Sequence, residues 1–406
     1  MDRIAKVESQ AINLVKDRRF LFKAGQTIGS LGLVGESRNR LIIFLAALTS
    51  MNPVQKRRNS VMVLGPSGTG KTALIEIPLK LFPPEFVVRR ASFSRQALAY
   101  GEEPLDKKAL FIDEYRGGKE AQYFLRLLQS EGQIAHEIAA RGKTEVRLRL
   151  GSPVVLTTTT EETIFEDDMT RFLMISSDDS AEQNVAVMKA ELNEVSPEAK
   201  SEVNVWRRAV RSLFDNYKQL AFPPWFAYVA EQVPSQNTRA RRDWKRFLGL
   251  MQSIAMCSPD PKRNGQITIE DYCVGHSLLN PAFTASTFAI NENELRIGSL
   301  VKQLYKQSDT AVTIKEIRDR LGWNPSLAYK YVKAAARHQI IKYEGGTREK
   351  NVKLVLPMKG LSAEFLPSPY KVLDNAKELE PSVEYVDPLS GEEMMWERSV
   401  AVRRKG

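Results

Sequence analysis

The chain contains the segment Gly65-Pro66-Ser67-Gly68-Thr69-Gly70-Lys71-Thr72, which matches the phosphate-binding pattern G-x-x-x-x-G-K-[ST] at every defined position. An apolar run, Val61 to Leu64, ends directly before it, and Lys71 to Glu76 continues in helix-forming residues, which completes the strand, loop and helix order of the motif. Glycines permit the positive φ angles that turn backbone N–H groups toward a phosphate, and a helix N-terminus adds partial positive charge. An ordinary glycine-rich turn is the alternative, and the flanking strand and helix signals disfavour it.

This segment predicts ATP and Mg²⁺ as cofactors. Lys71 would hold the β and γ phosphates, and the hydroxyl of Thr72 would ligate Mg²⁺. The other residues of the loop would surround the phosphates; they are Gly65, Pro66, Ser67, Gly68, Thr69 and Gly70. The nucleotide site is therefore expected at the end of the strand that precedes Gly65.

A second apolar run is followed directly by two carboxylate residues. Ala109-Leu110-Phe111-Ile112 is followed by Asp113 and Glu114, and ligands of parallel α/β sheets bind at the carboxyl ends of the strands. We expect Asp113 to hold the Mg²⁺ shell and Glu114 to orient and deprotonate the attacking water. Acidic residues after an apolar run are commonly just a strand end, but a complete phosphate loop earlier in the chain favours the catalytic interpretation.

Length, charge and cysteine content limit the possible classes of protein. A chain of 406 residues is too long for one ordinary core, which predicts two or three domains. The longest uncharged apolar run, Leu41 to Leu48, is too short to cross a bilayer, and Cys257 and Cys273 lack metal-ligand spacing. We therefore expect a reduced, cytoplasmic compartment and no membrane partner. The net charge of +10 favours a polyanionic partner such as nucleic acid, although many basic proteins bind nothing anionic specifically.

Two strand-like segments follow the acidic pair. Gln133 to Ile138 and the strictly alternating Glu145 to Leu150 are joined by Ala140-Arg141-Gly142-Lys143-Thr144. This pattern predicts a β-hairpin with a cationic tip, where Arg141 and Lys143 can contact nucleic-acid phosphates irrespective of sequence. A solvated hairpin with ordinary surface charge is the alternative.

Three more residues are candidates for contact with the nucleotide. The buried strand Pro153 to Leu156 runs into four threonines, of which Thr159 and Thr160 could hydrogen-bond the attacking water or the γ-phosphate. Simple β-propensity also explains these threonines. Arg171 begins a strand-like run, where it could stabilise charge on the γ-phosphate of a neighbouring subunit, or pair locally with the aspartates that precede it.

Together these segments resemble the AAA+ ATPases over roughly residues 30 to 250. Besides the phosphate loop and the run ending in Glu114, Thr170-Arg171-Phe172 is similar to a Ser-Arg-Phe finger motif. The hairpin before the threonine strand resembles the branch that includes minichromosome-maintenance helicases and the helicases of phage and mobile-element replication. The phage-type helicases also have a segment similar to Leu128-Gln129-Ser130-Glu131-Gly132. Minichromosome-maintenance proteins have asparagine where this chain has a threonine, which leaves the sensor position open.

The resemblance implies a homohexameric ring that uses ATP to pull single-stranded DNA through a central pore, with forked DNA as a substrate. The hairpins would touch the strand, and Arg171 would act on the neighbour's nucleotide. A primase or an initiator protein is an expected partner in the replication of a phage or mobile genetic element. The alternative is a replication initiator or helicase loader that uses ATP as a switch. A transcriptional activator is disfavoured because no Gly-Ala-Phe-Thr-Gly-Ala-type loop occurs in the ATPase segment.

The C-terminal half is expected to contain a helical lid, a winged helix and a tail. Arg242 opens a lid helix and resembles a second sensor, with Arg241 as the next candidate and surface charge as the alternative. Residues 312–357 have two cappable helices followed by a hairpin, which is typical of a winged helix. Its candidate DNA contacts are Ser326, Tyr329, Lys330 and Lys333 on the second helix, with Arg348 and Lys350 on the wing; protein docking is the alternative. The proline-containing, acidic stretch from Lys359 is expected to be poorly ordered or partner-bound.

We therefore predict an α/β fold in which an AAA+ P-loop parallel sheet with a helical lid is followed by a winged-helix domain. ATP would bind in the core, between subunits of the ring. The expected boundaries are 1–30 for an N-terminal helical leader, 31–180 for the ATPase core, 181–303 for the lid and linker, 304–357 for the winged helix and 358–406 for the tail.

Overall fold

The structure is a computed structural model that describes most of the chain. The described residues are 2–92, 94, 98, 101, 103–115, 119–140, 143–160, 170–234, 239–259, 263–288, 292–308, 312–337, 340–344, 353–355 and 364–398. Three predicted DNA contacts, Arg141, Arg348 and Lys350, lie outside this set, and so does the side chain of Lys143.

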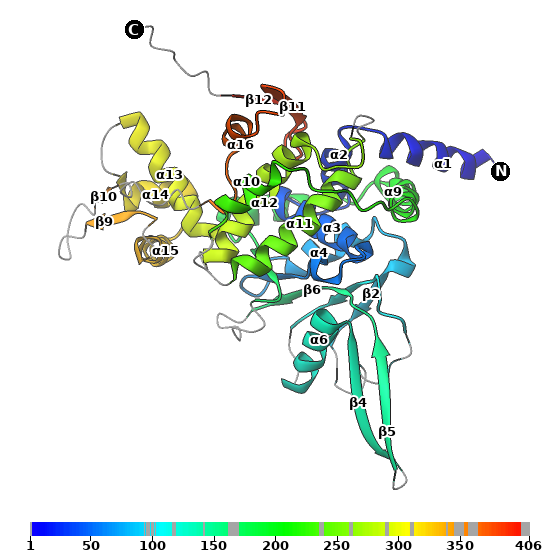
Figure 1. Ribbon diagram of the computed structural model, residues 1–406. Coiled ribbons are helices and arrows are strands. Elements are labelled where there is room, and N and C mark those ends of the chain that lie inside the picture. The colour runs from blue at the N-terminus through cyan, green and yellow to red at the C-terminus, as the bar shows by residue number, and fades with distance from the viewer. Residues whose placement is uncertain are drawn as a thin grey trace.

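A parallel sheet of five strands forms the centre of the molecule (Figure 1). The strand order is β2-β3-β6-β1-β7, and every neighbouring pair is parallel. Because all five strands run in one direction, their carboxyl ends lie along the same edge of the sheet. The strands are β1 (Val61–Leu64), β2 (Val87–Arg90), β3 (Ala109–Ile112), β6 (Val154–Thr159) and β7 (Leu173–Ser176).

Helices cover both faces of this sheet, which explains why its strands are continuous apolar runs rather than alternating ones. On one face, Val61, Val63 and Phe111 pack against α3 (Ser37–Leu48) and α4 (Lys71–Leu79). On the other face, Met62 and Leu110 pack against α6 (Lys119–Glu131). Successive strand residues thus enter different cores, as the two-residue period of a strand requires.

The hairpin that the alternating pattern predicts is present as β4 (Gln133–Ala140) and β5 (Lys143–Leu150). Its antiparallel register runs from Gln133 opposite Leu150 to Ala140 opposite Lys143. Figure 1 shows both strands extending together beyond the body of the molecule. The side chains of Val146, Leu148 and Leu150 are more than half exposed, so this face of β5 has no apolar cover from the described residues.

The N-terminal helices pack against a helix that lies far away in sequence. α1 (Asp2–Val15) and α2 (Phe20–Ser30) lie beside α9 (Pro197–Asp215), and Trp206 of α9 is the centre of the contact. The ring of Trp206 lies 5.0 Å from the ring of Phe20 and 6.3 Å from that of Phe44 in α3, measured between centroids. Residues 2–30 are therefore packed on the sheet domain.

Further helices follow the sheet. α8 (Ala181–Ala190) begins with a side-chain cap from Ser180, and α10 (Phe226–Gln232), α11 (Ala240–Met256) and α12 (Ile269–Phe288) surround an aromatic core. Phe247 of α11 contacts Phe226 and Phe283, with ring centroids 6.3 Å and 6.1 Å away. Short 3₁₀ segments connect elements of the sheet domain; they are η1 (Thr49–Met51), η2 (Gln55–Arg57) and η3 (Pro84–Phe86). Among the described helices, none combines the length and apolarity needed to span a bilayer.

A smaller unit with its own core follows α12. Its sheet is antiparallel, with the order β8-β10-β9, and Ile317, Trp323 and Val332 are buried in its core. Thr313 and Glu316 form the capping box that starts α14, which confirms the predicted cap. The elements are α13 (Glu292–Ser308), β8 (Val312–Thr313), α14 (Ile314–Leu321), α15 (Pro325–Arg337), β9 (Lys342–Glu344) and β10 (Lys353–Val355).

The expectation of a poorly ordered tail is wrong for residues 364–398. This segment contains α16 (Pro369–Asn375), β11 (Ser382–Val386) and β12 (Glu393–Glu397), and it packs on α12. Phe365 is fully buried and stacks on Phe283 at 5.1 Å between centroids, while the hydroxyl of Tyr272 donates to the carbonyl of Pro367 at 2.6 Å. The short apolar runs of this segment are buried because they pack against residues of α12, such as Cys273 and Phe283.

Close packing between α11 and the segment before β1 yields a stability prediction. A Cβ at Gly249 would overlap the carbonyl oxygen of Arg57, which is held by the side-chain amide of Asn59 at 2.9 Å. Alanine usually stabilises a helix by about 1 kcal/mol over glycine. We expect Gly249→Ala to destabilise the protein by about 1–3 kcal/mol instead, because the backbone of Arg57 cannot move away. Scanning calorimetry should show a lower melting temperature.

Gly275 of α12 provides the matched control. A Cβ there would overlap only the sulfur of Met251, and a thioether side chain can turn aside. Gly275→Ala should therefore cost less than Gly249→Ala. A melting temperature of Gly249→Ala at or above that of the wild type would contradict this account of the α11 contact.

Candidate functional site

The carboxyl edge of the sheet gathers the residues that the sequence assigns to the nucleotide. Leu64, directly before the loop, pairs with Thr159 of β6 on one side and with Ser176 of β7 on the other. Ile112, directly before Asp113, pairs with Thr157 of β6. β6 therefore lies between the loop strand β1 and the acidic strand β3 and pairs with both.

The phosphate loop itself has the backbone that the motif predicts. Gly65, Gly68 and Gly70 have φ angles of 153°, 84° and 76°, values that side chains other than hydrogen rarely tolerate. α4 begins at Lys71, so its unpaired N–H groups and partial positive charge lie at the end of the loop. A loop of this conformation at a helix N-terminus fits the phosphates of a nucleotide.

The side chain of Lys71 is enclosed by the phosphate loop. This side chain is nearly buried, and Nζ donates to the carbonyl of Pro66 at 2.5 Å. Burial lowers the pKa of Lys71, and the negative charge of Glu114 opposes this effect. Glu114 thus lies close enough to interact electrostatically with the lysine, as expected for two residues that share one nucleotide site.

Backbone and side-chain hydrogen bonds fasten the acidic strand end to β6. The hydroxyl of Thr158 donates to the carbonyl of Asp113 at 2.6 Å, and the N–H of Tyr115 donates to the carbonyl of Thr158 at 2.8 Å. The carboxylate of Asp113 also pairs with Arg89 of β2 at 3.3 Å. Glu114, which lies between the two bonded residues, is therefore held at the sheet edge by its neighbours.

Thr72 and Asp113 carry the oxygen donors that Mg²⁺ prefers. Thr72 is exposed at the start of α4, and Asp113 is half-buried at the end of β3. Within the part of the chain that the structure describes, no group of three or more His, Cys, Asp and Glu side chains could hold a metal alone. The two residues fit an ion whose other ligands are phosphate and water oxygens.

The two candidate sensor threonines end β6. Thr159 is almost fully buried beside Leu64, and Thr160 is exposed. Both lie at the same sheet edge as the loop and Glu114, so both remain candidates for contact with the γ-phosphate or the attacking water.

Ser177 is a residue of the site that the sequence reasoning missed. Its hydroxyl lies 2.8 Å from that of Thr69 and donates to the carbonyl of Leu64 at 3.2 Å. A Cβ at Gly65 would overlap this hydroxyl, so the glycine is needed for space as well as for φ. Its only signal in the sequence is its place directly after a strand-like run.

A pocket of about 280 Å³ adjoins Ser177 and was also missed. Asn39 lines it and donates to the carbonyl of Ser176 at 2.9 Å and to the carboxylate of Glu36 at 2.7 Å. The other oxygen of Glu36 accepts from the N–H of Asp178 at 2.6 Å. Arg296 of α13 reaches the carboxylate of Asp178 at 3.4 Å and also lines the pocket. The pocket joins residues of α3, the end of β7 and α13, which are far apart in the sequence. No local sequence motif therefore predicts it.

Arg171 and Arg242 lie near the amino ends of the strands, at the edge of the sheet opposite the phosphate loop. Arg171 precedes β7 and hydrogen-bonds the hydroxyl of Ser130 at the end of α6, and Arg242 bonds the hydroxyl of Thr170. β7 is parallel to β1, and its four residues separate this edge from the phosphate loop by about 13 Å. Neither arginine is placed to contact phosphates bound at the loop of its own chain.

The described DNA-contact candidates share one face of α15. Tyr329 is 45% exposed, and Lys330 and Lys333 are also exposed. The ammonium of Lys333 lies 4.7 Å from the ring centroid of Tyr329, and that of Lys330 lies 5.8 Å from the ring centroid of Tyr331. These residues form a cationic and aromatic surface on the C-terminal unit.

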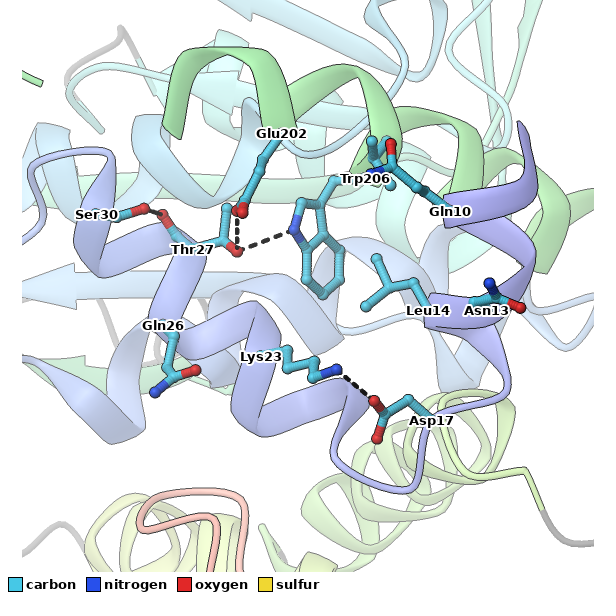
Figure 2. Close-up of a pocket in the computed structure, with 11 residues that line it drawn as sticks. Gln10, Asn13, Leu14, Asp17, Lys23, Gln26, Thr27, Ser30, Glu202 and Trp206 are labelled. Carbon is cyan, nitrogen blue, oxygen red and sulfur yellow. Dashed lines mark hydrogen bonds and ion pairs between the residues drawn. The ribbon is translucent and has the colours of Figure 1, made fainter. Parts of the chain in front are cut away.

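A separate cavity of about 590 Å³ lies between α1, α2 and α9 (Figure 2). There Trp206 Nε1 donates to Thr27 Oγ1 at 3.0 Å, and this hydroxyl lies 3.1 Å from the carboxylate of Glu202. Lys23 pairs with Asp17 on the opposite side of the cavity. The cavity contains none of the residues that the sequence assigns to the nucleotide.

Comparison with protein families identifies the core of the chain. The family model described as the MTBMA_p00010 P-loop domain matches residues 11–216, which is just over half of the 406 residues. No curated protein matches the chain. The matched segment begins within α1, contains the phosphate loop and all five strands of the parallel sheet, and ends directly after α9. The chain therefore belongs to the MTBMA_p00010 P-loop domain family.

Proposed function

We propose that this protein is an AAA+ ATPase that acts as a DNA helicase or translocase in the replication of a phage or mobile genetic element. The observation that carries the proposal is the position of the β4–β5 hairpin. It is inserted directly before β6, the strand that lies between the phosphate loop and Glu114. A hairpin connected to this strand can move when the conformation of the nucleotide site changes.

The strand order supports the assignment to the AAA+ class. In β2-β3-β6-β1-β7, the threonine strand β6 separates the loop strand from the acidic strand. An AAA+ core needs this order, because a sensor residue must lie between the phosphate loop and the catalytic carboxylate. The helices α8 to α12 would then be the lid of the domain.

The residues at the carboxyl edge suit the hydrolysis of ATP. Lys71 and the loop N–H groups would hold the phosphates, and Thr72 and Asp113 would hold Mg²⁺, which when bound neutralises phosphate charge. Glu114 would orient the attacking water and accept its proton. Thr159 or Thr160 would hydrogen-bond that water, and the pocket beside Asn39 would take the nucleoside part of ATP.

Arg171 and Arg242 support an assembly in which subunits complete one another's sites. They lie at the edge opposite the loop, so they can act only on a nucleotide held by another copy. A contact that joins two different faces of identical subunits is head-to-tail, and it closes into a ring when the rotation fits. We propose a homohexamer with Arg171 as the finger that stabilises charge on the neighbour's γ-phosphate.

A buried arginine ties the hairpin to the segment that precedes β3. Arg149 of β5 is almost fully buried, and it donates to the carbonyl of Glu103 at 3.0 Å and to that of Gly101. The segment that contains these carbonyls leads into β3, which ends at Asp113. A shift of β3 is thereby passed to the hairpin, whose cationic tip would grip single-stranded DNA in the pore.

The C-terminal unit favours a second candidate function, a DNA-bound ATP switch such as a replication initiator or helicase loader. The element order from β8 to β10 is that expected of a winged helix, with α15 as the recognition helix. Tyr329, Lys330 and Lys333 on the exposed face of α15 support contact with duplex DNA. Strand displacement on a forked duplex, measured beside ATPase with and without single-stranded DNA, separates the candidates. Displacement indicates the helicase, and ATP-dependent duplex binding without displacement indicates the switch.

The role of Glu114 can be tested by substitution. We expect Glu114→Gln to retain ATP binding and to lower turnover by about 100-fold or more, because a general base contributes on the order of 10²–10⁴ to the rate. Lys71→Ala should lose binding itself. Titration with a fluorescent ATP analogue and a phosphate-release assay measure the two effects. Hydrolysis retained by Glu114→Gln would overturn the assignment of the base.

The hairpin tip yields a second test. Replacing Arg141 and Lys143 with alanine should abolish strand displacement but preserve basal ATPase, because the tip would grip DNA and contains none of the residues assigned to the nucleotide. The matched control replaces the exposed Lys189 and Lys200, which removes the same charge elsewhere. Unchanged displacement by the hairpin variant, or equal loss in the control, would refute a role for the tip.

The surface of α15 yields a third test. Lys330→Ala with Lys333→Ala should weaken duplex binding in fluorescence anisotropy and reduce the slope of log affinity against log salt by about 2, because each phosphate contact contributes roughly one unit. The variant with Lys189 and Lys200 replaced again provides the charge-matched control. Equal affinity and equal slope in the two variants would show that α15 does not contact DNA.

A further inference from the structure

A fully buried carboxylate stands at the start of α11. Asp243 is 0% exposed and accepts hydrogen bonds from three side chains. Nε of Arg239 lies 3.2 Å away, Nη1 of Arg246 lies 2.9 Å away, and Oγ1 of Thr287 in α12 lies 2.8 Å away. The carboxylate thus joins two turns of α11 to the end of α12.

Both arginines also hydrogen-bond the backbone of the segment that contains Arg171. Nη2 of Arg246 donates to the carbonyl of Thr170 at 2.7 Å, and Nη1 lies 3.4 Å from the carbonyl of Phe172. Nη2 of Arg239 donates to the same carbonyl of Phe172 at 3.3 Å. The carbonyls before and after Arg171 are therefore held by guanidinium groups that a single carboxylate orients.

The charges in this cluster depend on Asp243. Burial lowers the pKa of Arg246 to about 10, and the charge of Asp243 opposes that effect, so the arginine remains protonated at neutral pH. Without the carboxylate, Arg239 and Arg246 would each lose the ion pair that now orients the guanidinium group. Such groups reorient or draw in water, and the carbonyls that they hold are released.

We propose that Asp243 is a positioning residue for Arg171: it orients Arg239 and Arg246 so that they fix the backbone on both sides of the finger, and it thereby couples α11 and α12 to the neighbouring subunit's nucleotide. This inference rests on the proposed head-to-tail assembly. Asp243 acts through the two arginines and touches no nucleotide. Movement of α11 and α12 would accordingly advance or withdraw the finger at the subunit boundary.

A mixing experiment tests the inference. Asp243→Asn should lower ATPase on the order of 100-fold, because a finger displaced by about 1 Å loses its transition-state contact. ATP binding should be unchanged, since the phosphate loop lies at the other sheet edge. Mixed with Lys71→Ala subunits, which keep an intact finger, Asp243→Asn should regain activity at about one quarter of the boundaries in a random equimolar ring.

A second mixture separates this inference from the assembly on which it rests. Arg171→Ala mixed with Lys71→Ala should regain activity to the same extent, because each partner supplies what the other lacks. If that mixture stays inactive, the composite site is wrong. If it recovers and the Asp243→Asn mixture does not, the composite site stands and the role of Asp243 is refuted, as it also is by wild-type turnover of Asp243→Asn alone.

Asp271 supplies the matched control for loss of a buried ion pair. It is 1% exposed and pairs with Arg263 at 2.5 Å. Asp271→Asn should lower the melting temperature but leave ATPase within about twofold of the wild type, as expected for a purely structural pair. A loss that is rescued by Lys71→Ala subunits in this control would overturn the specific role of Asp243. If Asp243→Asn fails to fold, Arg239→Gln carries the same test by the same criteria.

Discussion

Strand polarity is the constraint on which the rest of this structure depends. All five strands of the central sheet run in one direction, so whatever follows them in sequence meets at one edge. The apolar character of β1, β3 and β6 fits this arrangement, because the helices that connect parallel strands cover both faces of the sheet. The hydrogen bond from Thr158 to the carbonyl of Asp113 and the contact of Ser177 with Thr69 follow from that shared edge. The position of the nucleotide site is therefore set first by the order and direction of the strands, and only then by individual side chains.

The same polarity separates the two ends of β7. Ser177, after the strand, lies beneath the phosphate loop, and Arg171, before the strand, lies at the other edge. An arginine at that edge cannot complete the site of its own chain. In the proposed ring, the two halves of each catalytic site come from different subunits, so a dissociated subunit would be inactive even with ATP bound. Assembly and hydrolysis would then be controlled by the same contact.

The sequence predicts the parts of the site that depend on local pattern. The phosphate loop, the run ending in Asp113 and Glu114 and the hairpin are each encoded in consecutive residues, and the structure has each of them as strand, loop or turn. The pocket beside Asn39 and the cluster around Asp243 join segments more than 40 residues apart, so no local pattern reveals them. The fold of residues 364–398 could not be predicted for the same reason, because Phe365 packs against Phe247 of α11 and Phe283 of α12, which are far away in sequence.

The edge that carries Arg171 also carries the base of the hairpin. Arg171 bonds Ser130 in the last turn of α6, and β4 starts three residues after that serine. The N–H of Gly151, at the end of β5, donates to the carbonyl of Gly132 at 2.9 Å, which closes the hairpin directly against this helix end. In the proposed ring, loss of the γ-phosphate from one subunit would release the finger of the next, and α6 would carry that movement into the hairpin of the same chain. In that ring, the finger and the hairpin would move together, because both are hydrogen-bonded at or next to the end of α6.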